Sequence, residues 1–312
     1  MQQVHTIPSP PARPDDAHKG TFGTVIVVGG CETMLGAPAM CARAALRSGA
    51  GLVKVACPPS VLGHVLTIEP SATGIALAED ATDYVEAAQY NIDRADPECK
   101  AVLAVGPGMG LDRHRQALVL RLLAGPRGVV LDADGLNHLA ISFGDAGDNA
   151  KCGSDSPALR SNAAKGRPAD SDKPPARVLT PHPGEFRRLA GPLGITADPT
   201  IDEQRPDAAE ALALALDAVV VLKGKGSVVT DGQRYFVNTT GNPAMAAAGS
   251  GDVLTGLIAS LVAQGMDGFD AAVLGTHAHG LAADYWAKQH GPSGLRAMEL
   301  ADAIPGVLWR LG

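Results

Sequence analysis

Short runs of β-branched and other apolar residues recur along the chain, and glycine or proline follows most of them. The first run, at 24–28, reads TVIVV and precedes Gly29 and Gly30. A run without polar alternation is typical of a strand buried on both faces of a parallel sheet. The same pattern predicts strands at 52–57, 101–105, 128–132, 177–180 and 218–222, and a hairpin of two shorter strands at 227–230 and 234–237.

Segments rich in alanine and leucine lie between these strands. They predict helices at 36–47, 113–123, 134–140, 205–216, 253–263, 269–288 and 296–309, and one that opens at Pro183. Pro305 and Gly306 are expected to interrupt the last helix, because proline removes a helical hydrogen bond. Strands that alternate with helices predict an α/β fold with a largely parallel, doubly wound sheet flanked by helices. Such sheets bind ligands at the carboxyl ends of their strands, where the glycine-rich turns of this chain fall.

Two segments depart from this alternation. Residues 1–17 are rich in proline and polar residues, and we expect them to form an extension ahead of one domain at 18–312. Residues 144–175 are polar, rich in small residues and without periodicity, which predicts a surface insertion.

Composition narrows the classes of function. Of the 312 residues, 46% are hydrophobic but only 4% aromatic, which favours close helix–sheet packing over an aromatic-lined groove. The net charge of −7, without a basic cluster, argues against a nucleic-acid partner. No apolar run is long enough to span a membrane, and the first residues lack a signal-peptide pattern. The five cysteines are scattered without metal-binding or disulfide spacing, which indicates a reduced, cytoplasmic protein.

The stretch 242–252 (NPAMAAAGSGD) is small and nearly uncharged, and it ends in one carboxylate before an apolar run. Backbone N–H groups of Gly249, Ser250 and Gly251 at the start of a buried helix would form an anion site that a phosphate can approach closely. Asp252 would then be placed to hold or deprotonate a hydroxyl. The alternative is that Asp252 only caps its helix.

Lys223 follows a predicted buried strand and is succeeded by Gly224, Lys225, Gly226 and Ser227. A lysine beside glycines suits phosphate, through its charge and accessible N–H groups, although the spacing is not that of a Walker A loop. The alternative is a charged lead into the hairpin.

Two acidic residues, Asp132 and Asp134, lie at or just past a strand end, where they could bind a cation or cap a helix. Capping is the favoured interpretation for at least one of them.

His277 and His279 are two residues apart in a predicted helix and do not share a face. We therefore interpret them as packing or supporting residues and not as a metal pair.

His182 stands between two prolines in TPHPGE (180–185), which fixes its backbone outside a regular helix. It could be a structural residue of the turn, but we favour a side chain that faces a ligand. Glu185 could instead be a carboxylate of the following helix's first turn.

The loop 106–110 (GPGMG) is only faintly like a dinucleotide loop. It is either an ordinary turn or a place where the backbone closely approaches a ligand.

These motifs, in this order, resemble one family from about residue 18 to the C-terminus. They are HKGTFG at 18–23, GAP at 36–38, GPG at 106–108, TPHPGE at 180–185, LKG at 222–224, and the stretch 242–252. Together they are similar to the ADP/ATP-dependent NAD(P)H-hydrate dehydratases, which have a ribokinase-like fold. Ala244 stands where the family usually has glycine, and Ser250 replaces its threonine with another hydroxyl. An epimerase domain that often precedes this domain is expected to be absent.

The resemblance implies a repair reaction that removes water from the S-epimer of hydrated NADH or NADPH and consumes ADP or ATP, with Mg²⁺ as cofactor. The standalone arrangement favours ADP, which would become AMP and phosphate. The resemblance places the hydrate at Ala37, Gly108, His182 and Asp252. It places the nucleotide at Lys223, Gly224, Lys225, Gly226, Ser227 and Gly251. It gives no metal ligands, and it suggests a homotetramer.

Two other hypotheses remain at this point. A small-molecule kinase of the same fold, such as a hydroxyethylthiazole or hydroxymethylpyrimidine kinase, would use Asp252 in the same way but leave the phosphate on its product. TPHPGE favours the dehydratase. A non-catalytic nucleotide-binding protein is the third possibility, and the intact Gly-Ser-Gly-Asp at 249–252 argues against it.

Overall fold

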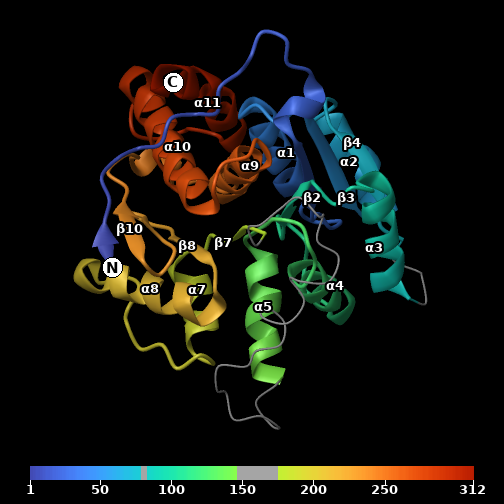
Figure 1. Cartoon of the computed structure of the whole chain (residues 1–312), viewed down its shortest axis with the longest axis horizontal. Coiled ribbons are helices and arrows are strands. Elements are labelled where there is room, and N and C mark those ends of the chain that lie inside the picture. Colours follow the sequence, from blue (N-terminus) through green and yellow to red (C-terminus); the bar gives the residue numbers. More distant parts are fainter. Residues whose placement is uncertain (79–82, 146–174) are drawn as a thin grey trace.

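A single twisted sheet forms the centre of the molecule (Figure 1). The computed structural model describes residues 1–78, 83–145 and 175–312. Within these residues the strand order is β1-β10-β9-β8-β7-β6-β5-β2-β3-β4. All neighbours run parallel except β9, which is antiparallel to both β8 and β10. The strands are β1 (Gln2–Gln3), β2 (Thr24–Val28), β3 (Leu52–Cys57), β4 (Thr73–Ala76), β5 (Val102–Val105), β6 (Val129–Leu131), β7 (Arg177–Leu179), β8 (Val219–Leu222), β9 (Val228–Thr230) and β10 (Arg234–Val237).

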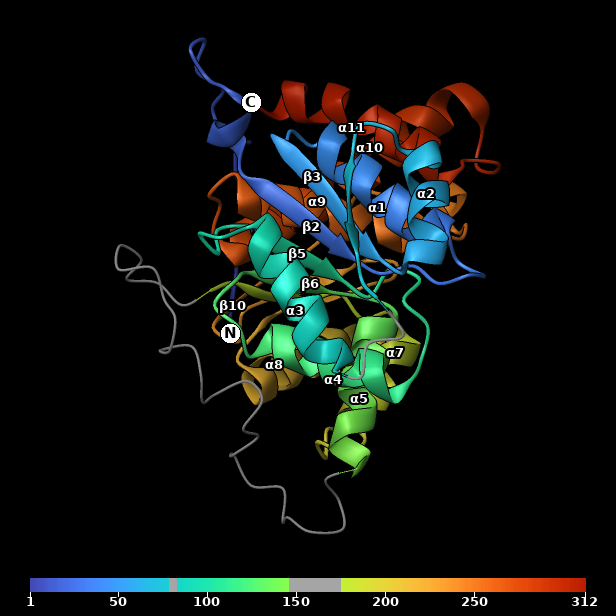
Figure 2. The ribbon, with the colours of Figure 1, turned by 90° about the vertical axis from the view of Figure 1, so that its right-hand side faces the viewer.

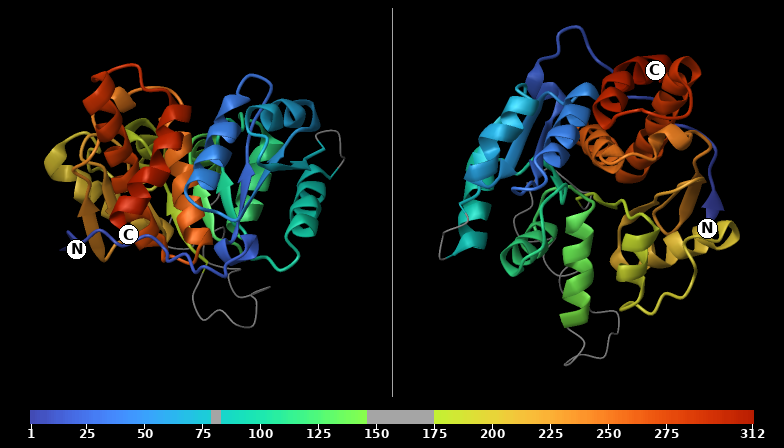
Figure 3. Two further views of the ribbon diagram at one scale, coloured as in Figure 1. Left: turned by 90° about the horizontal axis from the view of Figure 1, so that it is seen from above. Right: turned by 180° about the vertical axis from the view of Figure 1, so that it is seen from behind.

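Helices cover both faces of the sheet (Figures 2 and 3). On one face lie α3 (Tyr84–Ala95), α4 (Arg113–Leu123), α5 (Asp134–Asp145), α7 (Pro183–Ala190) and α8 (Arg205–Leu216). On the other face lie α1 (Gly36–Arg47), α2 (Pro59–Ile68), α9 (Ser250–Ala263) and α10 (Gly268–His290). The outermost helix, α11 (Ala297–Leu311), packs on α1, α9 and α10. Three short 3₁₀ turns complete the elements, namely η1 (Lys19–Phe22), η2 (Asp202–Gln204) and η3 (Pro243–Met245).

Strand β2 shows why these sequences form a doubly covered sheet. Successive side chains of a strand point to opposite faces. Ile26 and Val28 therefore join the core beneath α3 and α4, whereas Val25 and Val27 join the core beneath α1 and α9. All four are fully buried, so the strand has no place for polar alternation.

Helix α9 is held close to α1 by small residues. A Cβ added to Gly256 would lie 2.0 Å from the carbonyl oxygen of Cys41 in α1, so the two helix backbones touch at this point. The interior of α9 from Val253 to Leu261 is buried throughout. Packing of this kind fixes the position of the helix's first turn, which lies at the carboxyl edge of the sheet.

Most expected elements are confirmed, with several differences. Helix α5 continues to Asp145, and the sequence patterns missed α2, β4 and α3 as well as the edge strand β1. The expected interruption of the last helix is wrong, because α11 runs through Pro305. Burial of Ile304 and Val307 on either side of the proline maintains the helix despite the lost hydrogen bond.

Of the predicted insertion, residues 146–174 lie outside the described residues. Within the described part of the chain, no helix is long and apolar enough to cross a membrane.

The α1–α9 contact gives a first test. Gly256→Ala should lower the free energy of unfolding by about 2–3 kcal/mol, because the new methyl group meets backbone that cannot move aside. The matched control is Gly63→Ala, whose Cβ would meet nothing within 4 Å in α2 and which should be neutral or stabilising. Denaturant unfolding of both variants measures the difference, and equal stabilities would contradict the close contact.

Candidate active site

Five strands that are adjacent in the sheet, β8, β7, β6, β5 and β2, end beside one another. Backbone pairing continues past their ends, since Thr180 N–H donates to Leu131 O at 3.1 Å and Lys223 N–H donates to Pro181 O at 2.8 Å. This continued pairing brings the predicted turns of the sequence to one edge. The side chains that follow the strands therefore start from a rigid backbone.

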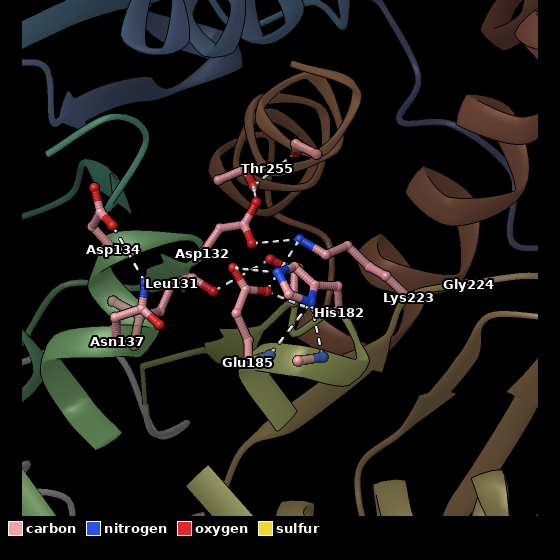
Figure 4. Close-up of polar contacts among 12 residues, drawn as sticks. Leu131, Asp132, Asp134, Asn137, His182, Glu185, Lys223, Gly224 and Thr255 are labelled. Carbon is pink, nitrogen blue, oxygen red and sulfur yellow. Dashed lines mark hydrogen bonds and ion pairs between the residues drawn. The ribbon is translucent and has the colours of Figure 1, made fainter. Parts of the chain in front are cut away.

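A buried ion pair joins two of these strand ends (Figure 4). Lys223 Nζ donates to Asp132 Oδ1 at 2.6 Å, and Asp132 Oδ2 accepts a 2.7 Å hydrogen bond from Thr255 Oγ1 in α9. Glu185 Oε2 lies 3.7 Å from the same ammonium group. The side chain of Asp132 is 2% exposed and that of Lys223 18%. One lysine thus faces two buried carboxylates and is connected through one of them to α9.

Burial and charge act in opposite directions on these groups. Burial acts to lower the pKa of Lys223, but Asp132 and then Glu185 outweigh it and raise that pKa above its ordinary value. The ammonium therefore stays charged at neutral pH. In Glu185, burial is the largest influence and raises the pKa of the carboxyl, although Lys223 acts to lower it.

The amino end of α9 lies against this ion pair. Gly249 precedes the helix with φ of 90°, which favours glycine. The first bond of the helix runs from Val253 N–H to Gly249 O at 3.1 Å, so the N–H groups of Gly251 and Asp252 point out of the helix end. A Cβ on Gly251 would lie 3.3 Å from Lys223 Nζ and 3.4 Å from Asp132 Oδ2, so the lysine and the carboxylate that holds it both reach the first turn of α9. Outward N–H groups, a helix dipole and an ammonium group therefore meet at one point, which is the geometry of an anion site.

Asp252, in the first turn of α9, is the third carboxylate of this cluster. Its burial and then the charge of Asp132 raise the pKa of Asp252 to about 7, against the opposing effect of Lys223. Cys41 of α1 also lies within electrostatic reach of Asp252, which contributes to raising the pKa of the Cys41 thiol above its usual range after burial. Asp252 can therefore take up or release a proton near neutral pH beside an anion site.

His182 is the N-cap of α7. Its Nδ1 accepts hydrogen bonds from Gly184 N–H at 2.9 Å and Glu185 N–H at 3.4 Å, and Glu185 Oε2 accepts one from His182 N–H at 2.8 Å. The histidine therefore caps the helix while its side chain remains 51% exposed, and Glu185 is a carboxylate of the helix's first turn. Burial, followed by Lys223, lowers the pKa of His182. The neutral ring with Nδ1 as acceptor carries its proton on Nε2, which lies 3.5 Å from Glu185 Oε1.

The loop after β5 reaches α1. Gly108 has φ of 58°, and a Cβ there would lie 2.9 Å from the Cβ of Ala37. The two predicted hydrate-side residues are therefore in contact. Ala37 is one helical turn before Cys41, whose thiol lies within electrostatic reach of Asp252. These contacts connect the loop at Gly108 to the amino end of α9.

The turn that follows Lys223 is closed by its own serine. Ser227 Oγ donates to Gly224 O at 2.9 Å and accepts from Gly224 N–H at 3.2 Å. Arg205 of α8 holds the residue before the turn, because its guanidinium donates a 2.9 Å hydrogen bond to Leu222 O. Lys225 is exposed. Strand β9 starts at once afterwards, so the turn is also the lead into the hairpin.

Among the described residues, no group of three His, Cys, Asp or Glu side chains is placed to hold a metal ion. Asp132 accepts from Lys223 Nζ, and Asp134 Oδ2 accepts from Gly110 N–H at 2.8 Å. The expectation of a helix-start role for at least one of the two fits Asp134, which lies in the first turn of α5 and whose Oδ1 accepts from Asn137 Nδ2 at 3.3 Å in that helix, whereas Asp132 contacts Lys223 and Thr255 of other elements.

Comparisons with known proteins agree with this geometry. The family model described as NAD(P)H-hydrate dehydratase matches residues 25–306. The chain belongs to the NAD(P)H-hydrate dehydratase family. It is 40% identical over 314 residues to the bifunctional NAD(P)H-hydrate repair enzyme of Moorella thermoacetica, an alignment that covers 96% of this chain and 52% of that protein. The corresponding enzyme of Thermofilum pendens is 36% identical, with 97% of this chain and 52% of that protein covered. The chain thus spans about half the length of these curated relatives.

Solved structures show the same relationship. The ADP/ATP-dependent NAD(P)H-hydrate dehydratase of Bacillus subtilis, co-crystallised with ATP and Mg²⁺, superposes with a TM-score of 0.73 at 27% identity, over 97% of this chain and 95% of that chain. A ribokinase-like protein of Enterococcus faecalis gives a TM-score of 0.73 at 24% identity over 97% and 92% of the two chains, which shows a ribokinase-like fold. The expected fold class is confirmed.

Two supporting residues of this dehydratase-family site, Thr255 and Asp132, were not identified as such from the sequence. Thr255 and Asp132 form the connection to Lys223 described above. From the sequence, Asp132 was interpreted only as a helix cap or a cation ligand. His279, expected to be a packing or supporting residue, lies with its Nε2 2.9 Å from Ser250 O, and burial lowers its pKa to about 4. Ala244, where the family usually has glycine, lies buried in η3 with Asn242 as N-cap. That position therefore accommodates a methyl group.

The raised pKa of Asp252 predicts a stability that depends on pH. The folded-state pKa of about 7 exceeds that of an unfolded aspartate, so the native state is penalised as pH rises from about 4 to about 7. Asp252→Asn should therefore increase the free energy of unfolding at pH 8 by on the order of 2 kcal/mol, and the gain should vanish towards pH 4.

Denaturant unfolding between pH 4 and pH 8 measures this gain. The control is Asp207→Asn, which removes an exposed carboxylate from the first turn of α8 and thus shares the loss of the helix-dipole interaction. A gain that is independent of pH, or equal in the two variants, would contradict the buried-carboxylate account.

Proposed function

We propose that the protein dehydrates the S-epimer of NADH or NADPH hydrate and couples this to conversion of ADP into AMP and phosphate, which makes it a hydro-lyase of metabolite repair. The observation that carries this proposal is the position of Asp252. It stands beside an anion site formed by the start of α9 and Lys223, with a pKa raised to about 7. A phosphoryl group and a hydroxyl can meet there.

Asp252 acts as the general base. Hydroxide is a poor leaving group, whereas phosphate is a good one, so the ring hydroxyl is first phosphorylated. Asp252 accepts the hydroxyl proton as the oxygen attacks the terminal phosphorus of the nucleotide. A carboxylate with a pKa near the working pH suits this role, because it is largely ionised yet basic enough to take the proton.

The anion site stabilises the transferred phosphoryl group. Of the N–H donors expected at Gly249, Ser250 and Gly251, that of Ser250 is taken by Ala247 O at 3.4 Å, so we assign the developing charge to the outward N–H groups of Gly251 and Asp252. A preorganised set of donors needs no rearrangement during transfer. Lys223 and the turn of Gly224, Lys225, Gly226 and Ser227 hold the nucleotide phosphates. AMP departs as the phosphate ester forms.

Elimination then completes the reaction. The ring nitrogen lone pair expels phosphate by breaking the carbon–oxygen bond, and loss of a proton from the neighbouring ring carbon restores the dihydropyridine. Ala37, Gly108 and His182 line the hydrate side. Because the cap of α7 occupies His182 Nδ1, the Nε2–H, which lies 3.5 Å from Glu185 Oε1, is the ring donor that would turn to an oxygen of the hydrate.

Magnesium fits this site as a companion of the nucleotide. Mg²⁺ is commonly held by substrate phosphates with few protein ligands, and the described residues contain no preset cluster of three ligands. The ion would neutralise phosphate charge when bound.

We also propose a cytoplasmic location, which the free cysteines within the described residues support. We further propose a homotetramer, and light scattering of the purified protein tests this oligomeric state.

The direct test is incubation of the protein with NADH hydrate, Mg²⁺ and either ADP or ATP, followed by absorbance of the reduced nicotinamide. We expect recovery of NADH with stoichiometric release of phosphate, and faster with ADP than with ATP. No recovery with either nucleotide, together with phosphorylation of an alcohol such as hydroxyethylthiazole, would support the kinase alternative instead.

The base assignment predicts the behaviour of Asp252→Asn. Turnover should fall by about 10³-fold or more, because the hydroxyl proton has no acceptor, while the dissociation constant of ADP stays within about threefold. Asp270→Asn is the matched control, since it removes a carboxylate from the first turn of α10 away from the site. Steady-state kinetics and calorimetry make the comparison, and retained turnover in Asp252→Asn would refute the role.

His182 is tested by two substitutions. His182→Asn keeps an N-cap acceptor for α7 but removes the ring, whereas His182→Ala removes both. Both should raise the KM for the hydrate about tenfold with little effect on the KM for ADP, and only His182→Ala should also lower stability by about 1 kcal/mol. A rise in the KM for ADP without a rise in the KM for the hydrate would contradict a hydrate-binding position for His182.

A further inference from the structure

Asp132 stands between the two parts of the proposed site and touches both. Both of its oxygens are used, one by Lys223 Nζ at 2.6 Å and the other by Thr255 Oγ1 at 2.7 Å (Figure 4). Lys223 belongs to the turn proposed to hold nucleotide phosphates. Thr255 belongs to α9, whose first turn carries the anion site and Asp252. A single carboxylate therefore connects the two elements that must act on one phosphate.

The backbone around Asp132 holds its side chain in this direction. Its N–H donates to Val105 O at 3.0 Å, and its carbonyl accepts from Gly135 N–H at 2.9 Å. The next residue, Ala133, has φ of 49°, a left-handed conformation that alanine rarely adopts. Such strain is maintained only where the surroundings determine it, and it is common at functional sites.

Lys223 has other partners within reach. Glu185 Oε2 lies 3.7 Å from its ammonium group, and Asp252 is close enough for the two charges to affect one another. A lysine side chain is long and flexible, so it turns toward whichever carboxylate is free. If Lys223 paired with Asp252, the base would lose its affinity for a proton and the phosphate its counter-charge. Asp132 prevents this pairing by holding the ammonium beside Gly251.

We propose that Asp132 is a positioning residue of the reaction, which clamps Lys223 to the amino end of α9 and keeps the ammonium on the phosphate and off the Asp252 carboxylate. This inference rests on the proposed function. Because both oxygens of Asp132 are taken by Lys223 and Thr255, Asp132 acts through Lys223.

Electrostatics support the geometry. The titratable and charged groups that act on Asp252 are Asp132, Lys223, Asp134, Glu185 and, from α1, Cys41. After burial, Asp132 is the largest influence that raises the pKa of Asp252, and Lys223 opposes it. Replacing Asp132 with a neutral residue removes the first influence and strengthens the second. Both changes lower the pKa of Asp252.

Asp132→Asn is the central variant, and it keeps the size and the acceptor for Thr255. The KM for ADP should rise about tenfold, because Lys223 is no longer held at the phosphate. The acidic limb of the pH profile of kcat/KM should move down by about one pH unit, because a less basic Asp252 ionises at lower pH. A purely structural role would reduce activity at every pH without moving the limb.

Thr255→Val and Thr255→Ser separate the clamp from the charge. Thr255→Val releases Asp132 from α9 but leaves its charge, so the KM for ADP should rise while the acidic limb stays in place. Thr255→Ser restores the hydroxyl and should restore the wild-type KM. In a Lys223→Met background, Asp132→Asn should raise the KM for ADP by less than in the wild type, because the two residues act as a unit.

The outcomes distinguish the possibilities. Unchanged KM for ADP and an unmoved limb in folded Asp132→Asn would overturn the proposal, as would an equal limb shift in Thr255→Val. If Asp132→Asn fails to fold, as judged by its thermal transition, the Thr255→Val and Thr255→Ser pair decides, and equal KM values in those two variants would overturn the clamp. Failure of the proposed function is a separate result, because wild-type protein would then form no NADH from hydrate and ADP.

Discussion

Lys223 and Asp132 come from strands that are not neighbours, since β7 lies between β8 and β6. Their 2.6 Å contact is made where the strands end, and Thr255 extends it to α9. A buried carboxylate next to two others is unfavourable unless a cation faces it. The single ammonium group therefore allows Asp132, Glu185 and Asp252 to lie close together, and the perturbed proton affinity of Asp252 depends on how that one charge is shared.

The position of α9 depends in turn on small residues. Gly256 lets α9 touch the backbone of α1 at Cys41, and Gly249 allows the sharp entry into the helix. The chain is low in aromatic residues and rich in glycine and alanine for the same reason. Close packing holds the outward N–H groups of the first turn in a fixed direction, which is what preorganised stabilisation of a phosphoryl group requires.

Sequence patterns predicted the parallel core, because an uninterrupted apolar run such as TVIVV at 24–28 is stable as a strand only where both of its faces are buried. They also located the amino end of α9, since GSGD at 249–252 combines backbone freedom with one acid. They missed α2 because Pro58, Pro59 and Gly63 are more typical of a turn, and α3 because the short strand before it, β4, was not recognised either. They did not identify the Thr255–Asp132–Lys223 connection, because those residues are far apart in the chain and each has an ordinary local explanation. Asp132 looks like a cap, and only the folded backbone shows that both its oxygens point to other elements. The double role of His182, as cap and as exposed donor, likewise requires the hydrogen bonds of the ring.

The account makes phosphate, and not water, the group that leaves the nicotinamide ring. The most direct measurement follows the oxygen atom of the hydrate. NADH hydrate labelled with ¹⁸O at the ring hydroxyl, turned over with ADP and Mg²⁺, should give inorganic phosphate that carries one ¹⁸O, because the hydroxyl oxygen attacks phosphorus before the carbon–oxygen bond breaks. Mass spectrometry of the released phosphate reads this out. Unlabelled phosphate, with the ¹⁸O found in water, would contradict the phosphorylated intermediate and the role of Asp252 as the base that forms it.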